Sequence, residues 1–246
     1  MEGKSVYDCT GFDRGLEELE ITLTETQKQQ FLDYYELLTE WNSFMNLTAI
    51  TEFQEVVTKH FLDSLSLVRV MEGKNLKGRL IDVGTGAGFP GIPLKIAFPE
   101  LEVSLLDSLN KRVKFLEETA EKLNLKGIEA IHGRAEDFGK NSDYRERFDL
   151  CVSRAVANLN LLSEYCLPFV KKGGMFVSYK SGNVREEVEN SGKAVKILGG
   201  KLERTYFFRL AGTDMDRSFV CIRKAAPTPK KYPRKAGVPS KEPLGK

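Results

Sequence analysis

A glycine-rich segment is the feature of this sequence with the clearest chemical meaning. Residues 82–91 read Asp-Val-Gly-Thr-Gly-Ala-Gly-Phe-Pro-Gly and follow a short apolar run at 79–83. Glycines at such a place let the backbone approach a ligand that a Cβ would exclude. An ordinary strand-to-helix turn needs only one or two glycines, so the segment predicts a ligand-binding turn between a strand and a helix.

Three classes of ligand compete for this turn. A nucleotide phosphate loop is excluded because no Lys-Ser or Lys-Thr pair follows the glycines. A dinucleotide fingerprint is matched formally by Gly86-x-Gly88-x-x-Gly91, but the glycine run begins earlier, with Gly84 at the strand end. In the third class, S-adenosylmethionine (SAM), these glycines wrap the methionine and ribose. Asp82 would repel a pyrophosphate but can pair with the methionine ammonium, which favours SAM.

Two later strand ends carry further candidate contacts. Asp107 follows a predicted strand at 102–106, where an acid can accept hydrogen bonds from ribose hydroxyls. NAD enzymes share that acid, so Asp107 indicates an adenosine nucleoside without choosing the cofactor; capping of the next helix is the alternative. The loop at 133–137 follows a strand at 128–131, and in SAM folds this loop borders the adenine.

The end of the predicted strand at 148–153 is where a methyl acceptor is expected. The Asp/Asn-Pro-Pro-aromatic cluster of enzymes that methylate exocyclic amines is absent there. Cys151 alternates within the apolar strand and is predicted to be a small core residue rather than a nucleophile. Arg154, at the mouth of the sheet, can hold a phosphate, a base edge or the SAM carboxylate, with a surface salt bridge as the alternative.

Strands that alternate with helices predict an α/β fold. The four strands named above are followed by a predicted strand at 174–179 and then by two strands without a helix between them, at 202–209 and 218–223. This pattern predicts a Rossmann-like class I SAM-dependent methyltransferase fold with a mainly parallel seven-stranded sheet and a terminal antiparallel hairpin. Predicted helices at 24–45 and 52–70 form an N-terminal helical cap. The expected segments are the cap at 1–75, the methyltransferase domain at 76–224 and a tail at 225–246.

The composition is ordinary for a soluble globular protein, with 246 residues, 41% hydrophobic and 29% charged. The N-terminus lacks an apolar signal core and no apolar run is long enough to cross a membrane, so we expect a cytoplasmic protein. Dispersed cysteines and only two histidines argue against a metal site. The tail is basic and proline-rich, which suits either phosphate neutralisation or a solvated end.

Several stretches together resemble the RsmG (GidB) family of bacterial ribosomal RNA methyltransferases. They occur in the family's order and span roughly residues 22–244: Asn46-Leu-Thr-Ala-Ile50, Lys59-His-Phe-Leu-Asp-Ser-Leu65, Leu80-Ile-Asp-Val-Gly-Thr-Gly-Ala-Gly-Phe-Pro-Gly-Ile-Pro-Leu94, Leu106-Asp-Ser-Leu-Asn-Lys-Arg112, Ser153-Arg-Ala-Val-Ala157 and Tyr232-Pro-Arg-Lys-Ala-Gly-Val-Pro-Ser-Lys-Glu-Pro-Leu244.

The resemblance implies methyl transfer from SAM to N7 of one guanine in 16S rRNA, with S-adenosylhomocysteine as product. Carried over residue by residue, the implied SAM contacts are Gly84, Phe89, Asp107, Ala135, Glu136 and Arg154. The implied rRNA contacts in the tail are Tyr232, Arg234, Lys235 and Lys241. The partner would be 16S rRNA, the small ribosomal subunit or its assembly intermediate, and we expect a monomer that needs neither metal nor membrane.

The chemistry of this reaction agrees with the absence of an obvious catalytic base. Guanine N7 has an exposed lone pair, so it can attack a sulfonium methyl directly without losing a proton. Arg154 is expected to position SAM or the target nucleotide, with Lys180 assisting through phosphate contacts. His60 is interpreted as a packing residue. The alternatives are a SAM enzyme that acts on a small molecule or protein, and a nucleotide-sensing Rossmann-like module without catalytic activity.

Overall fold

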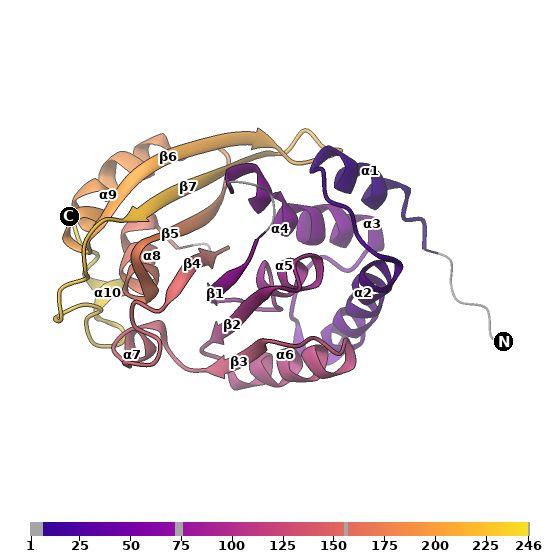
Figure 1. The fold of residues 1–246 in the computed structure, drawn as a ribbon, viewed down its shortest axis with the longest axis horizontal. Coiled ribbons are helices and arrows are strands. Elements are labelled where there is room, and N and C mark those ends of the chain that lie inside the picture. Colours follow the sequence, from indigo (N-terminus) through magenta and orange to yellow (C-terminus); the bar gives the residue numbers. More distant parts are fainter. Residues whose placement is uncertain (1–6, 72–75, 155–156, 246) are drawn as a thin grey trace.

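The chain folds around one seven-stranded sheet (Figure 1), and the computed structural model describes residues 7–71, 76–154 and 157–245. The strand order is β3-β2-β1-β4-β5-β7-β6, with β7 antiparallel to both of its neighbours and the other pairs parallel. The strands are β1 (Gly78–Val83), β2 (Leu101–Asp107), β3 (Ile128–His132), β4 (Phe148–Ser153), β5 (Val170–Ser181), β6 (Gly200–Arg209) and β7 (Asp216–Lys224).

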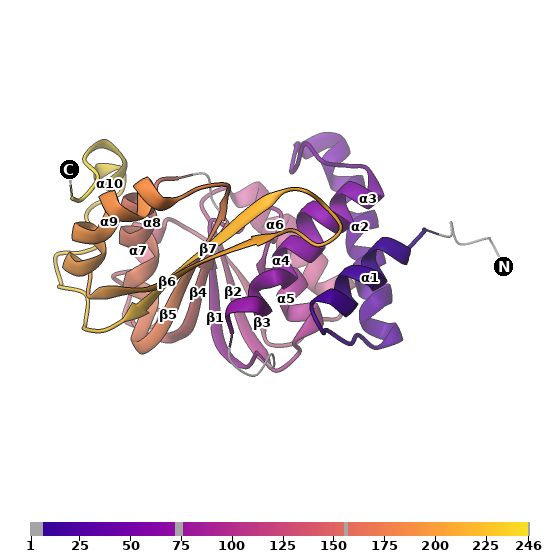
Figure 2. The ribbon, with the colours of Figure 1, turned by 90° about the horizontal axis from the view of Figure 1, so that it is seen from above.

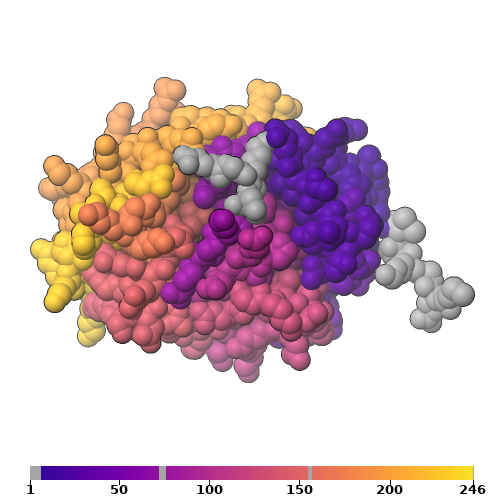
Figure 3. Space-filling view, in the orientation of Figure 1, coloured from indigo at the N-terminus to yellow at the C-terminus, as the bar shows by residue number. Residues whose placement is uncertain are grey.

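Helices cover both faces of the sheet, and Figure 2 shows the two layers on opposite sides of it. One layer consists of α1 (Thr10–Glu18), α2 (Glu25–Met45), α3 (Phe53–Val56), η1 (Val57–Leu62), α4 (Asp63–Leu65), η2 (Ser66–Val70), α5 (Gly91–Ala97) and α6 (Asn110–Lys122). The other consists of α7 (Ala135–Phe138), α8 (Leu159–Cys166), η3 (Leu167–Phe169), α9 (Arg185–Ile197) and α10 (Val238–Lys241). In Figure 3 the C-terminal residues, in yellow, lie at the end of the molecule opposite to the N-terminal helices, in indigo.

The alternation of side chains along each strand divides the core in two. Leu80 and Val152 join a hydrophobic cluster with the N-terminal helices, whereas the neighbouring Ile81 and Cys151 join a second cluster under α8 and α9. Cys151 is therefore a core residue, as expected. The N-terminal helices share one hydrophobic cluster with the sheet, so the cap is a layer of the same core.

All seven predicted strands are present, and the predicted terminal hairpin is antiparallel. The predicted helix at 52–70 is not continuous: it contains a π-helical segment at Val57–Leu62 and a 3₁₀ segment at Ser66–Val70. β5 begins at Val170, earlier than expected, and α1 has no counterpart in the sequence-based prediction. The boundary expected at residue 75 lies outside the described residues.

Hydrogen bonds from α2 attach the cap to the glycine turn and to α5, the helix that follows the turn. Thr24 and Gln27 form a capping box at the start of α2, and Gln27 Nε2 also donates to the Ile96 carbonyl at the end of α5 (2.7 Å). Further along α2, the fully buried Tyr34 donates its hydroxyl hydrogen to the carbonyl of Ala87 in the turn. A sequence-distant helix thus determines where the turn lies.

Asp82 holds the turn together from beneath. Its Oδ2 atom accepts hydrogen bonds from Thr85 Oγ1 (2.7 Å) and from the Gly91 amide (2.9 Å), so one carboxylate oxygen joins both ends of the turn. The side chain is fully buried. Burial raises the pKa of Asp82 to about 7, although the two hydrogen bonds oppose this shift.

Neither a spanning helix nor a metal cluster appears in the part of the chain that the structure describes. No helix there is long and apolar enough to cross a membrane. No group of three or more His, Cys, Asp or Glu residues there is arranged to hold a metal ion.

The raised pKa of Asp82 predicts a pH-dependent effect of Asp82→Asn on stability. Because the pKa is higher in the folded state than in the unfolded state, the wild-type protein loses stability as pH rises from about 4 through 7. The side chain of the Asp82→Asn variant does not titrate, so the variant avoids this loss of stability. Its amide oxygen still accepts the hydrogen bonds from Thr85 and Gly91. Urea unfolding of the ligand-free protein should show the variant improving relative to wild type by at most about 1.4 kcal/mol for each pH unit over this range.

The exposed Asp143→Asn substitution is the matched control for the loss of one negative charge. Curves of unfolding free energy against pH that run parallel for wild type and Asp82→Asn would show that the buried carboxylate does not titrate as expected.

Candidate active site

Three cavities lie in series at the carboxyl ends of the parallel strands, where the strand order reverses between β1 and β4. The outer cavity, of about 340 Å³, is lined mainly by the ends of β1 and β2 and by residues 133–136. The turn cavity, of about 160 Å³, shares Gly84 with the outer cavity. The large cavity, of about 540 Å³, shares His60 and Arg154 with the turn cavity.

The glycines of the turn serve two different purposes. Gly84 and Gly86 have left-handed φ angles of 73° and 64°, and a Cβ at either would meet nothing within 4 Å. Both line the turn cavity, so a side chain there would take space available to a ligand. At Gly88 a Cβ would lie 2.5 Å from Ile92 Cδ1 and 2.8 Å from Tyr34 Oη. Gly88 is therefore required for packing.

Two of the expected ligand contacts, Asp82 and Gly88, lie outside the walls of these cavities. Asp82 lies beneath the turn with its carboxylate turned toward Thr85 and Gly91, and lines none of the three cavities. Gly88 lies against the cap and is also absent from the cavity walls. Both residues shape the turn, whereas Gly84, Gly86 and Phe89 face the cavities.

The outer cavity is lined by the acids expected there. The carboxylate of Asp107 accepts hydrogen bonds from the amides of Gly86 (3.0 Å) and Leu109 (2.9 Å), which fixes it at the cavity wall. Ala135 and Glu136 line the same cavity at α7. Tyr165, on α8, completes this wall; burial and the nearby Glu136 raise its pKa to about 12, so its hydroxyl stays protonated.

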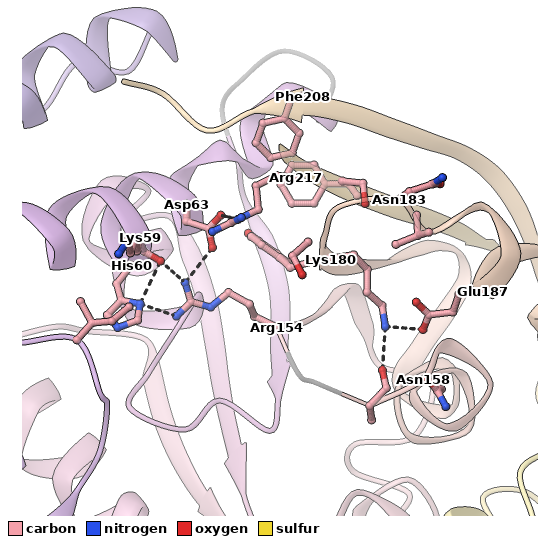
Figure 4. Close-up of a pocket in the computed structure, with 17 residues that line it drawn as sticks. Lys59, His60, Asp63, Arg154, Asn158, Lys180, Asn183, Glu187, Phe208 and Arg217 are labelled. Carbon is pink, nitrogen blue, oxygen red and sulfur yellow. Dashed lines mark hydrogen bonds and ion pairs between the residues drawn. The ribbon is translucent and has the colours of Figure 1, made fainter. Parts of the chain in front are cut away.

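Arg154 forms the wall between the turn cavity and the large cavity (Figure 4). Its Nη1 donates to Asp63 Oδ2 (3.0 Å) and to the Lys59 carbonyl (3.1 Å), and its Nη2 lies 3.2 Å from His60 Nδ1. The guanidinium carbon also lies 5.0 Å from the centre of the Phe89 ring. These contacts hold the guanidinium rigidly at the junction of the two cavities.

His60 is a neutral packing residue in this wall. Its ring stacks on Phe89 at 4.5 Å, and burial, followed by the charge of Arg154, lowers its pKa to about 3. Because a guanidinium has only donors, we assign Nδ1 as acceptor from Arg154 and Nε2–H as donor to Thr48 Oγ1 (2.9 Å). The imidazole therefore positions Arg154 and Phe89 without adding charge.

Asp63 is a site residue that the sequence reasoning did not single out. This buried carboxylate accepts from Arg154 at one oxygen and from Arg217 Nε at the other, each at 3.0 Å. Arg217 lies on β7, far from Asp63 in the sequence, and the sequence did not single it out either. An acid next to the apolar pair Phe61 and Leu62 was the available signal for Asp63. No sequence signal paired it with Arg217.

The opposite wall of the large cavity contains Lys180, which lies apart from Arg154 in Figure 4. Its ammonium donates to Glu187 Oε1 (2.6 Å) and to the Ala157 carbonyl (2.8 Å). The expected phosphate contact therefore has to share Lys180 with an internal ion pair. Charged groups around this cavity are four cations (Lys59, Arg154, Lys180 and Arg217) and two carboxylates (Asp63 and Glu187).

The C-terminal residues occupy a different place from the one expected. Tyr232 is only 7% exposed and belongs to the hydrophobic cluster under α8 and α9, so its ring offers no face for stacking on a base. Arg234 is paired with the buried Glu164. Tyr232 and Arg234 thus have partners inside the protein, whereas Lys235 and Lys241 are exposed.

Comparisons with known structures agree with the architecture. TYW2 from P. horikoshii, solved in complex with MeSAdo, superimposes with a TM-score of 0.54 over 67% of this chain and 62% of that chain, at 15% identity. TYW2 from M. jannaschii, solved in complex with AdoMet, gives a TM-score of 0.52 over 67% of this chain and 76% of that chain, at 12% identity. At such low identity these likenesses show the fold alone.

Comparisons with known sequences are closer. A protein from Lachnoclostridium phytofermentans named "Ribosomal RNA small subunit methyltransferase G" is 56% identical over 96% of this chain and 98% of its own length. A protein of the same name from Acetivibrio thermocellus is 56% identical over 91% of both chains. The sequence model of the family described as rRNA small subunit methyltransferase G matches residues 27–218. The chain therefore belongs to the rRNA small subunit methyltransferase G family.

Proposed function

We propose that this methyltransferase transfers a methyl group from SAM to N7 of a guanine in 16S rRNA. The observation that carries the proposal is the wall shared by the turn cavity and the large cavity, formed by His60 and Arg154. A methyl donor bound beside the glycine turn and a guanine bound in the large cavity would meet at this wall. The family membership supports the small-subunit rRNA as the source of that base.

The residues around the two smaller cavities fit SAM. The open space above Gly84 and Gly86 accommodates a ligand that approaches the backbone, and the Asp107 carboxylate is placed to accept from ribose hydroxyls. Ala135, Glu136 and Tyr165 would border the adenine. When bound, SAM supplies a methyl group activated by a sulfonium.

The acceptor chemistry needs alignment rather than a base. Guanine N7 presents a lone pair, so direct in-line attack requires no proton acceptor, and His60 with its pKa of about 3 adds no competing charge. The purine gains positive charge during the transfer. Asp63 compensates Arg154 and Arg217, which reduces the repulsion between these cations and the ring.

The charge around the large cavity suits an RNA strand. Lys59, Arg154, Lys180 and Arg217 outnumber the carboxylates there, which favours binding of the phosphates that flank the base. The exposed Lys235 and Lys241 are further proposed phosphate contacts. A substrate that is 16S rRNA, naked or within the small subunit, implies a cytoplasmic protein.

The substrate assignment is tested by methyl transfer from labelled SAM to small ribosomal subunits from cells that lack this enzyme, with naked 16S rRNA in parallel. We expect label in 7-methylguanosine at one position of the 16S rRNA, identified by mass spectrometry of the nucleosides. The assignment would be contradicted if neither RNA preparation were labelled and small molecules or proteins were labelled in reactions without RNA.

The position of Arg154 predicts that Arg154→Ala lowers kcat/KM for methyl transfer by about 100-fold or more, because a small misplacement of the reactants is costly. Arg154→Lys retains the charge but not the three-way contact to Asp63, Lys59 and His60, and should recover only part of the activity. The control is Arg209→Ala, an exposed arginine on β6. Equal activity of the Arg154→Ala and Arg209→Ala variants would exclude a positioning role.

The two kinds of glycine predict different defects in a matched pair of variants. Gly84→Ala and Gly88→Ala share the strain of a positive φ, but only at Gly88 does the new Cβ meet packed atoms. Gly88→Ala should lose about 1–3 kcal/mol more stability than Gly84→Ala in urea unfolding. Gly84→Ala should instead weaken S-adenosylhomocysteine binding about tenfold or more in calorimetry. Wild-type affinity in Gly84→Ala would show that the ligand does not lie against this glycine.

A further inference from the structure

We propose that the C-terminal strap, residues 228–244, is a positioning element of the cofactor site that fixes α7 and α8, the helices that line the outer cavity. Figures 1 and 2 both show α10 of this strap beside α8. The proposal rests on the assignment of the outer cavity to the adenosine part of SAM. It gives the basic, proline-rich segment a role inside the protein.

The first anchor is Arg234, which binds α8. Its main-chain amide and its Nε both donate to Glu164 Oε1 (2.8 and 2.9 Å), and its Nη2 donates to Oε2 (2.7 Å). The Glu164 side chain is fully buried, so loss of Arg234 would leave a buried carboxylate without its counter-charge. Glu164 directly precedes Tyr165, which lines the outer cavity. The ion pair therefore fixes the part of α8 that carries this wall residue.

The second anchor is Gly237, which binds α7. The Gly237 amide donates to Glu136 Oε1 (3.0 Å), and Glu136 is a wall residue of the outer cavity. Gly237 has a φ of 83°, a left-handed conformation that favours glycine at this position. Arg234 Nη2 also donates to the Glu242 carbonyl (2.7 Å), which closes the strap on itself around Gly237. The same short loop thus holds both helices.

The beginning of the strap is fixed by Arg145, which follows α7 in the sequence. Its guanidinium donates to the Gly139 carbonyl at the end of α7 (2.7 Å) and to the strap carbonyls of Thr228 (2.7 Å) and Tyr232 (2.8 Å). Tyr232 itself is buried in the hydrophobic cluster under α8 and α9. The end of α7 therefore cannot shift without disturbing the strap.

These contacts link strap docking to cofactor binding. The strap donates hydrogen bonds to Glu136, which lines the outer cavity, and to Glu164, whose chain neighbour Tyr165 also lines it. A ligand that requires this arrangement of α7 and α8 must stabilise the docked strap, and the docked strap must favour the ligand by the same free energy.

The decisive comparison is between Arg234→Ala and Lys230→Ala, because both remove one positive charge from the strap. Lys230 is exposed, whereas Arg234 binds Glu164. By calorimetry we expect Arg234→Ala to weaken S-adenosylhomocysteine binding about tenfold or more and Lys230→Ala to leave it within about twofold. If Arg234→Ala binds S-adenosylhomocysteine like the wild type and instead loses affinity for 16S rRNA, the strap is an RNA arm and the proposal is overturned.

Hydrogen exchange of the wild-type protein provides a test that does not depend on a variant that folds. Saturating S-adenosylhomocysteine should slow amide exchange at Gly237 and across residues 133–139 together, by about tenfold or more. Slower exchange at residues 133–139 with an unchanged strap would overturn the inference while leaving the cofactor assignment intact. Absence of S-adenosylhomocysteine binding by the wild-type protein would instead contradict the proposed function itself.

Discussion

The buried carboxylate of Asp63 is the single group on which the arrangement of the large cavity depends. It lies in α4 of the N-terminal layer, and its two oxygens bind Arg154, which follows β4, and Arg217 of β7. The adjacent Ser64 carbonyl accepts a hydrogen bond from Tyr179 Oη on β5 (2.8 Å). A short helical turn thus ties the cap to three strands, and replacement of one partner of such a buried pair leaves charge without compensation.

Much of the fold could be predicted because its signals are local. Alternating apolar residues defined the strands, and the lack of a helix between residues 209 and 218 identified the terminal hairpin. The π-helical and 3₁₀ segments between Val57 and Val70 were not predictable from periodicity, since the apolar pattern there resembles an ordinary helix. His60 of the π-helical segment and Asp63, directly after it, both line the large cavity.

Site residues could be predicted from the sequence only where they directly follow a recognisable strand. The glycine turn, Asp107 and Arg154 all lie at strand ends, and the topology of a parallel sheet brings strand ends to one edge. The packing of the tail could not be predicted, because its basic composition indicates a solvated or RNA-bound arm and the buried Glu164 that pairs with Arg234 lies 70 residues away. Charge counted along a segment does not reveal which counter-charges the fold will bring to it.

The position of β7 has a consequence for the order in which the molecule can be completed. β7 lies between β5 and β6 in the sheet although it is the last strand in the sequence. A chain emerging from the ribosome can form the five parallel strands and the glycine turn, but β6 has no neighbour until β7 inserts beside β5. Arg217 arrives with that final strand, so during synthesis the Asp63 carboxylate waits for its second partner until the sheet closes. The strap that fixes α7 and α8 follows β7 in the sequence, so a nascent chain can complete the cavity lined by Arg217 before the strap positions the outer cavity.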